Sequence, residues 1–195
     1  MILCSFGSFL LCSCDFVIHQ KVQSTKLERV KLLKVLDGDT AKIELKGKTI
    51  TVRLFAIDTP ETLKPGINDE ESFAPYENAW GEVAKKELMK LIKRNSNKDI
   101  FYLKISADKY HREVGILFFK ESLDIKDSIN YYLVTNGLAR VAYFSFDKWR
   151  SPFYLKNEQQ RIFVKELLNA QSQALNNKMG FWKAGLENVF AKEWK

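Results

Sequence analysis

Two short segments that alternate apolar and polar residues on either side of one turn constrain the fold most. Residues 41–45 and 50–54 both place an apolar side chain at every second position. Because successive side chains of a strand point to opposite faces, this period is typical of a half-buried β-strand. Lys46-Gly47-Lys48 lies between the segments and provides the turn. The pair therefore predicts an antiparallel hairpin with one buried face.

The other periodic segments predict three further strands and three helices. Helices are indicated where apolar residues recur at the helical period beside charged ones, and strands where apolar and β-branched residues cluster between turn residues. We expect strands over residues 27–36, 100–106 and 114–119, and helices over residues 78–94, from Asp127 or Ser128 to Asn136-Gly137, and over residues 157–178. Strands that mostly precede helices indicate an α+β domain built on a five-stranded antiparallel barrel.

Composition narrows the class of protein. The chain has 195 residues, 46% of them hydrophobic, with only 9 Gly and 4 Pro, which excludes collagen-like and disordered classes and a membrane protein with many spans. The formal net charge of +7 makes nucleic acid or another anionic surface the first expected partner. Charge alone fits simple solubility equally well, because many basic proteins bind nothing anionic.

The first fourteen residues predict an export leader. They contain no Lys, Arg, Asp or Glu, and they hold all three cysteines of the chain. Leu11-Cys12-Ser13-Cys14 resembles a bacterial lipobox, in which Cys14 would become the lipidated N-terminus and anchor the protein to a membrane. The alternative is an N-terminal strand or helix of the mature fold. We expect residues 1–26 to be leader and polar linker, residues 27–195 to be one domain, and the protein to be exported, as a cell-surface lipoprotein or in secreted form.

Two acidic clusters lie at the ends of the predicted strands. Asp37-Gly38-Asp39-Thr40 precedes the hairpin, and Asp58 follows its second strand. An Asp-Gly pair alone is more often a simple turn. In an antiparallel hairpin, however, the start of one strand lies beside the end of its partner, so Asp39 and Asp58 can meet. Two facing carboxylates favour a hard divalent cation, Ca²⁺ or Mg²⁺.

Three further residues fit phosphodiester chemistry. Arg53 and Arg112 can neutralise charge that grows on a phosphorus centre, and Glu61 can take a proton from an attacking water. Each residue alone is more simply a solvated surface charge. Their combination with the paired aspartates carries the hypothesis of catalysis.

Four segments of the chain form a recognisable pattern in their order and spacing. They are Val35-Leu36-Asp37-Gly38-Asp39-Thr40, Val52-Arg53-Leu54-Phe55-Ala56-Ile57-Asp58-Thr59-Pro60-Glu61-Thr62, Asp108-Lys109-Tyr110-His111-Arg112 and Asn136-Gly137-Leu138-Ala139-Arg140-Val141-Ala142-Tyr143. The pattern resembles the thermonuclease, or staphylococcal nuclease-like, family, and the resemblance runs from about Leu27 to Trp182. It implies an OB-fold barrel with three helices and a calcium-dependent enzyme that hydrolyses DNA and RNA to fragments with 3′-phosphate ends.

The resemblance also implies roles for individual residues. It implies that Asp39, Asp58 and the carbonyl of Thr59 bind calcium. It further implies that Arg53 and Arg112 bind the scissile phosphate, that Glu61 acts as or near the general base, and that the nucleotide-binding wall contains Lys109, Tyr110 and Tyr143.

The chain departs from the best-known members in two places. Ser145 stands where those members have a second tyrosine, so base stacking is either weaker or supplied by Phe144 or Phe146. His111 and Glu113 flank Arg112 where those members have glycine. Glu113 is expected either to pair with Arg112 or to repel the phosphate.

We therefore expect an exported, calcium-dependent, monomeric nuclease of relaxed specificity that prefers single-stranded DNA and RNA. The alternative is a non-catalytic OB module that binds single strands. A third interpretation is a lipid-anchored surface protein that holds anionic polymers without turnover. Retention of the acidic residues together with Arg53 and Arg112 favours catalysis, because a pure binder has no need of the set.

Overall fold

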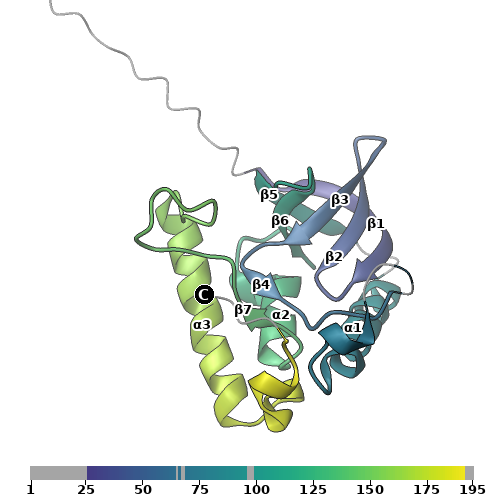
Figure 1. Cartoon of the computed structure of the whole chain (residues 1–195). Helices are drawn as coiled ribbons and strands as arrows, with labels where there is room; N and C mark the ends of the chain where they lie inside the picture. Colours follow the sequence, from purple (N-terminus) through teal and green to yellow (C-terminus); the bar gives the residue numbers. More distant parts are fainter. Residues whose placement is uncertain (1–25, 65, 67–68, 96–98, 192–195) are drawn as a thin grey trace, which may run out of the picture.

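The computed structural model describes residues 26–64, 66, 69–95 and 99–191 of the chain (Figure 1). The predicted leader and Cys14 lie outside these residues, so export and lipidation stay predictions. Among the residues described, no helix combines the length and the apolar character needed to cross a bilayer.

Five strands close into a barrel in the order β1-β2-β3-β6-β5 (Figure 1). All neighbouring pairs are antiparallel except β3 and β6, which run parallel. A closed ring with an odd number of strands cannot alternate direction throughout, so one parallel pair is unavoidable. The predicted α+β barrel is confirmed, with this one refinement to its antiparallel description. The strands are β1 (Glu28–Asp37), β2 (Thr40–Leu45), β3 (Lys48–Leu54), β5 (Ile100–Ala107) and β6 (Glu113–Phe118).

The predicted hairpin is formed by β2 and β3. Ile43 and Val52, one from each strand, are both fully buried, so the apolar positions of the alternation face the core. Lys46 and Gly47 have φ of 51° and 76°. Two consecutive residues with positive φ match the right-handed twist of the flanking strands, which is why a glycine is favoured in this turn.

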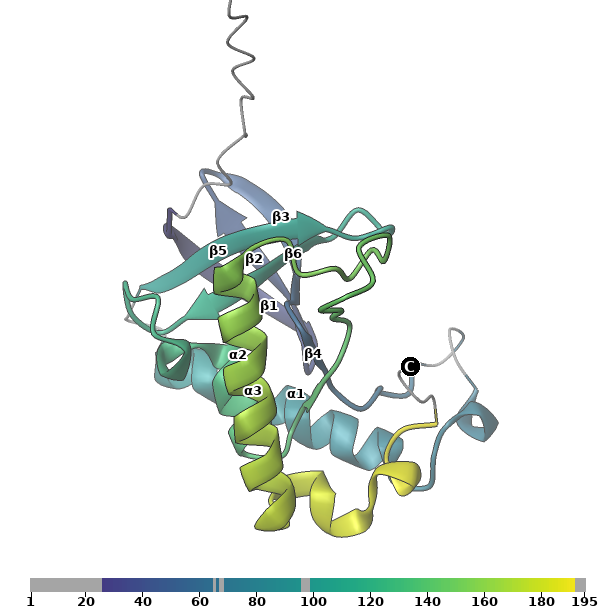
Figure 2. The ribbon, with the colours of Figure 1, turned by 90° about the vertical axis from the view of Figure 1, so that its left-hand side faces the viewer.

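Three helices pack on the barrel: α1 (Glu77–Arg94) and α2 (Ile129–Thr135) lie below it, and α3 (Glu158–Asn176) runs from beside the strands downward past α2 (Figures 1 and 2). Ser128 caps α2 by accepting a hydrogen bond from the backbone N–H of Tyr131, and Asn157 caps α3 through that of Gln160. Asp127, the other candidate cap, ends a preceding short 3-10 helix instead. Among the strands and helices, α1 packs mainly against β1, and α2 packs mainly against α3, η2 (Ile125–Asp127) and β6.

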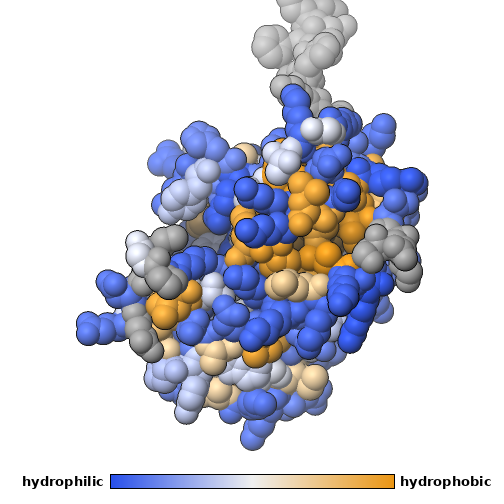
Figure 3. All heavy atoms as spheres, turned by 90° about the vertical axis from the view of Figure 1, so that its right-hand side faces the viewer, coloured by the Kyte–Doolittle hydropathy of each residue, from blue (hydrophilic) through white to orange (hydrophobic). Residues whose placement is uncertain are grey.

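A small second sheet and several single 3-10 turns complete the described fold. β4 (Ile57–Asp58) pairs antiparallel with β7 (Arg140–Val141). The 3-10 turns are η1 (Glu70–Ser72), η2 (Ile125–Asp127), η3 (Gly180–Ala184) and η4 (Leu186–Asn188). Figure 3 shows hydrophobic residues gathered over one side of the barrel and hydrophilic residues around them.

Candidate active site

One arginine joins the two aspartates that the hairpin geometry was expected to bring together. Arg53, on β3, forms an ion pair with Asp39, and its Nη2 lies 2.9 Å from Oδ1 of Asp58. The barrel register explains the placement, because Thr40 on β2 pairs with Arg53 and the N–H of Leu54 donates to the carbonyl of Asp39 at 2.8 Å. The β1–β2 turn, β3 and β4 therefore meet at one guanidinium group.

Both aspartates are buried. Asp39 is 1% exposed and Asp58 is 5% exposed. Oδ2 of Asp39 accepts hydrogen bonds from the backbone N–H and the hydroxyl of Thr59, at 2.9 and 3.0 Å. Burial raises the pKa of Asp58, and the charge of Asp39 raises it further, against the opposing effects of nearby arginines. A pair of carboxylates in this environment needs positive charge to remain ionised.

Arg140 supplies a second positive charge that sequence reasoning did not assign. It pairs with Asp58 in the β4–β7 register, and its Nε and Nη2 donate to Oδ2 of Asp58 at 3.1 and 2.9 Å. The guanidinium also lies 3.8 Å from the ring centroid of Phe190. A usable signal was present, because an arginine within the apolar run of residues 138–142 is expected to be buried and therefore paired.

Glu61 stands at the wall of a pocket of about 160 Å³ next to this cluster. Its side chain is 56% exposed, and Oε2 lies 4.0 Å from Nζ of Lys64, which itself pairs with Asp37. Desolvation raises the pKa of Glu61, and the charges of Asp37 and Asp39 raise it further. The same pocket is lined by Asp58, Thr59, Arg140 and Tyr143, so Asp58, Glu61 and one predicted nucleotide-binding residue share one opening.

Close packing of α1 positions the loop that carries Glu61. A Cβ atom at Gly81 would lie 2.4 Å from the carbonyl oxygen of Glu61 and 2.7 Å from that of Pro60. No side chain fits there, so the helix backbone directly supports the loop. The role of Gly81 was not predicted, although a glycine inside a helix often has a packing reason.

Arg112 is held within its own turn and not by the acidic cluster. Oδ2 of Asp108 accepts from its Nε at 2.7 Å, and Oδ1 accepts from the backbone N–H of Arg112 at 3.0 Å. His111 has φ of 61°, in the left-handed region that favours glycine, which accounts for the glycine of the best-known family members. Glu113 turns away, to Nζ of Lys104 at 2.7 Å, so the expected pairing with Arg112 is not formed.

The predicted nucleotide-binding residues lie on two separate segments. Tyr110, 66% exposed, has Nζ of Lys109 and the guanidinium of Arg112 at 5.0 and 5.4 Å from its ring centroid. Tyr143, in the segment after β7, has the Arg53 guanidinium 5.6 Å from its ring. The nucleotide-binding wall expected from the sequence would therefore be formed by one segment that precedes β6 in the chain and one that follows it.

The residues expected to replace the missing tyrosine point inward. Phe144 and Phe146 pack on each other, with ring centroids 5.6 Å apart, and both contact the core. Phe153 lies beside Tyr143 instead, at 5.4 Å, and is 43% exposed. The exposed aromatic neighbour of Tyr143 therefore comes from further along the chain.

The chemistry of the acidic pair fits a hard cation. Carboxylate and carbonyl oxygens are the ligands that calcium prefers. Asp39, Asp58 and Thr59 lie together, and Thr59 is hydrogen-bonded to Asp39. Within the described ranges, however, no three or more acidic, histidine or cysteine side chains form a metal-binding group. A cation would therefore depend on backbone and water oxygens besides these two carboxylates.

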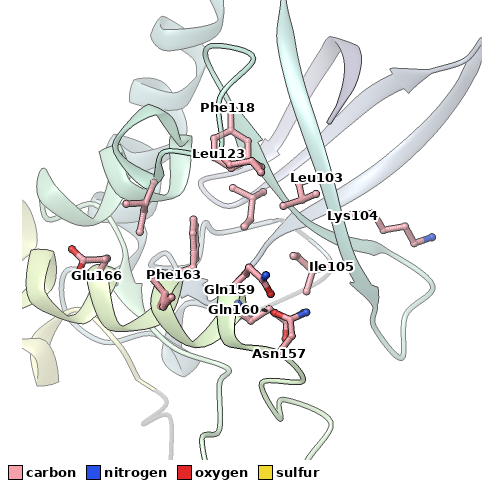
Figure 4. A pocket seen from close by; sticks show the side chains of 13 residues that line it. Leu103, Lys104, Ile105, Phe118, Leu123, Asn157, Gln159, Gln160, Phe163 and Glu166 are labelled. Carbon is pink, nitrogen blue, oxygen red and sulfur yellow. Dashed lines mark hydrogen bonds between the residues drawn. The ribbon is translucent and has the colours of Figure 1, made fainter. Parts of the chain in front are cut away.

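A larger pocket lies elsewhere in the described part of the chain. It measures about 260 Å³ and lies between β5, β6 and α3 (Figure 4). Its lining is mainly apolar and includes Ile105, Phe118, Leu123 and Phe163. None of the residues singled out from the sequence lines it, so size does not identify the reactive site here.

The chain is similar to known proteins along most of its length. Residues 51–184 match the family model of staphylococcal nuclease homologues, a range that holds Arg53, Asp58, Glu61 and Arg112 but begins after Asp39. The chain is 29% identical over 150 residues to a Thermonuclease from Staphylococcus intermedius, covering 77% of this chain and 73% of the relative. It is 38% identical over 164 residues to Endonuclease YncB of Bacillus subtilis, covering 84% and 65%, and 28% identical over 152 residues to a Thermonuclease from Staphylococcus hyicus, covering 78% and 74%.

Gly81→Ala tests whether α1 supports the loop of Glu61. Helix propensity alone would stabilise the protein by about 1 kcal/mol. Because the new methyl group would overlap the backbone of Pro60 and Glu61, we expect the free energy of unfolding in urea, followed by circular dichroism, to fall by about 1–3 kcal/mol instead. Val83→Ala, at an exposed position of the same helix, should change it by less than about 0.5 kcal/mol. A stabilised Gly81→Ala protein would contradict the close contact.

Proposed function

Because this chain belongs to the family of staphylococcal nuclease homologues, we propose that it is a calcium-dependent nuclease that hydrolyses DNA and RNA and leaves 3′-phosphate ends. Family membership and the names of the relatives support a nuclease function. The observation that carries the proposal is the ion pairing of Arg53 with two buried aspartates beside a pocket that Glu61 lines.

Arg53 and Arg112 are the phosphate-binding groups of the proposal. A planar guanidinium presents several donors in a fixed fork that matches phosphate oxygens. Arg53 is held in orientation by Asp39 and Asp58, and Arg112 is held by Asp108. Donors that are already oriented stabilise the charge that develops during phosphodiester cleavage without reorganising in the reaction.

Glu61 is the proposed general base. Its carboxylate lines the pocket and is exposed enough to contact water. The raised pKa of Glu61 makes this carboxylate a stronger base than an ordinary one, which favours removal of a proton from the attacking water. Lys64, between Glu61 and Asp37, restrains the position of the carboxylate.

Asp39, Asp58 and the carbonyl of Thr59 would hold calcium, which when bound supplies positive charge to the phosphate oxygens. Asp58 would bind the calcium while it also forms ion pairs with Arg53 and Arg140. An arginine that pairs with a carboxylate favours its ionised form, which is the form that binds a cation.

A non-catalytic module that binds single strands is the second candidate. Lys109 and Tyr110 on the surface would serve either function. Asp58 and Glu61 line one pocket, and Asp39 pairs with Arg53 next to Asp58. This arrangement favours catalysis, because negative charge beside a phosphate-binding arginine weakens simple anion binding and has a use only in the reaction.

Metal dependence provides the direct test of the proposal. We expect digestion of single-stranded DNA with calcium, no digestion with chelator, and slow digestion with magnesium. Magnesium requires tight octahedral geometry and keeps its waters, whereas a turn-built site with a backbone carbonyl suits calcium better. Gel analysis of a labelled oligonucleotide measures the rates and the product ends. Equal rates with magnesium alone would reject calcium as the working metal. Products with 5′-phosphate ends would contradict the proposed 3′-phosphate ends.

Glu61→Gln separates catalysis from binding. The amide retains the size of the carboxylate but cannot accept the proton, so kcat should fall by about a hundredfold or more. Calcium binding by titration calorimetry and DNA binding by fluorescence anisotropy should stay near the wild-type values. Glu44→Gln, at an exposed position of β2, is the matched control and should cleave normally. If Glu61→Gln fails to bind calcium, then Glu61 belongs to the metal site and another group activates water.

We also propose that the protein is exported and lipidated at Cys14, from the pattern Leu11-Cys12-Ser13-Cys14. A diacylated cysteine anchors a protein stably, whereas a single acyl chain anchors it marginally. Mass spectrometry of the native protein should find a lipidated Cys14 as the first residue. A different first residue, or an unmodified Cys14, would reject lipidation.

A further inference from the structure

Residues 144–156, between β7 and α3, form a hydrogen-bonded segment beside the site, and we call this segment the aromatic arm. A parallel bridge joins Ser145 to Tyr154 near the two ends of the arm. Arg161, on α3, donates from Nη2 to the carbonyl of Phe146 and to the hydroxyl of Tyr154, both at 3.0 Å. These bonds fix the base of the arm against α3.

The tip of the aromatic arm presents an indole ring and two cations. Trp149 is 69% exposed, and the guanidinium of Arg150 lies 4.7 Å from its ring centroid. The tip turns back on itself, because the N–H of Ser151 donates to the carbonyl of Lys148 at 2.8 Å. A tryptophan held outward leaves the faces of its ring available for stacking, and burial of the ring by a ligand would contribute free energy of binding.

Exposed rings connect the arm to the site. Phe153 of the arm lies 5.4 Å from Tyr143, and the guanidinium of Arg53 lies 5.6 Å from Tyr143 on the way to the acidic pair. Tyr143 and Phe153 are 37% and 43% exposed. The surface beside the pocket is therefore aromatic from the phosphate-binding arginine to the base of the arm.

The charge of the arm suits a polyanion. Residues 144–156 contain Lys148, Arg150 and Lys156 against a single acidic residue, Asp147. Base stacking on an aromatic ring with cations beside it is how single strands are bound without sequence preference, because every base has a π-face. The same composition would also suit the interface of an anionic membrane. Continuity of the rings with Tyr143 favours nucleic acid, because a membrane contact has no need of a link to the pocket.

We propose that Trp149 stacks on a base of a single-stranded nucleic acid outside the nucleotides held at the pocket, while Lys148 and Arg150 contact the neighbouring phosphates. The inference rests on the proposed nuclease function and extends it: the enzyme prefers strands long enough to reach the arm. It also names a further stacking residue for a chain that has Ser145 where the best-known members have a second tyrosine.

Trp149→Ala tests the proposal by comparing a long with a short substrate. Steady-state kinetics with calcium are measured on a 12-nucleotide oligothymidylate and on a 5′-phosphorylated thymidine dinucleotide. We expect KM for the 12-mer to rise about tenfold, the equivalent of ~1.4 kcal/mol. The rise for the dinucleotide should be several-fold smaller, because the dinucleotide does not reach the tip. Trp149→Phe keeps a stacking ring and should restore most of the affinity.

Binding without turnover gives an independent measurement. In EDTA, the anisotropy of a fluorescein-labelled 12-mer should show a Kd about tenfold higher for Trp149→Ala than for the wild-type protein. Met89→Ala, which removes an exposed apolar side chain from α1, should change neither KM nor Kd. Equal losses on both substrates, or no loss with Trp149→Ala, would overturn the proposal.

The same experiments distinguish two further outcomes. If Trp149→Ala binds the 12-mer normally but loses binding to phosphatidylglycerol vesicles, the arm is a membrane contact and the proposal is wrong. If the wild-type protein cleaves neither substrate, the proposed nuclease function fails, and the anisotropy comparison still decides whether Trp149 binds single strands.

Discussion

The ion pairs of Arg53 with Asp39 and Asp58 are the interaction on which the site depends. Three backbone segments converge on this guanidinium: the β1–β2 turn and β3 of the barrel, and β4 of the small second sheet. Burying two carboxylates is costly, and removal of the shared cation would break the ion pair of Asp39 and leave Asp58 paired with Arg140. The same side chain therefore serves the fold and the phosphate, which limits how freely it can be exchanged even for lysine.

Most of the barrel follows from local patterns in the sequence. The alternation around Ile43 and Val52 predicts a hairpin with one buried face because both strands obey a period of two. The start of α2 is local as well: the sequence leaves Asp127 and Ser128 as candidate caps, and the structure places the cap on Ser128. The pairing of Asp58 with Arg140 could not be predicted in this way, because strands of two residues have no period and the partners are far apart in the chain.

The direction of side chains in loops also could not be predicted from the sequence. Phe144 and Phe146 were candidates for base stacking, yet both pack against the core while Phe153 faces solvent beside Tyr143. A loop has no regular alternation from which to assign its inward and outward residues, so composition alone cannot choose among three phenylalanines. The position of Arg112 is a similar case, because its ion pair with Asp108 depends on the conformation of a single turn.

The parallel pairing of β3 with β6 has a consequence for how the protein folds. Parallel neighbours cannot be joined by a tight turn, and here α1 and β5 lie between them in the chain. Contacts between such distant segments carry a large cost in chain entropy and form slowly, whereas the β2–β3 hairpin is local. Arg53 stands opposite Val114 across this junction, two residues after Arg112. A chain with the hairpin formed and the barrel still open would thus have its first guanidinium in place without its second.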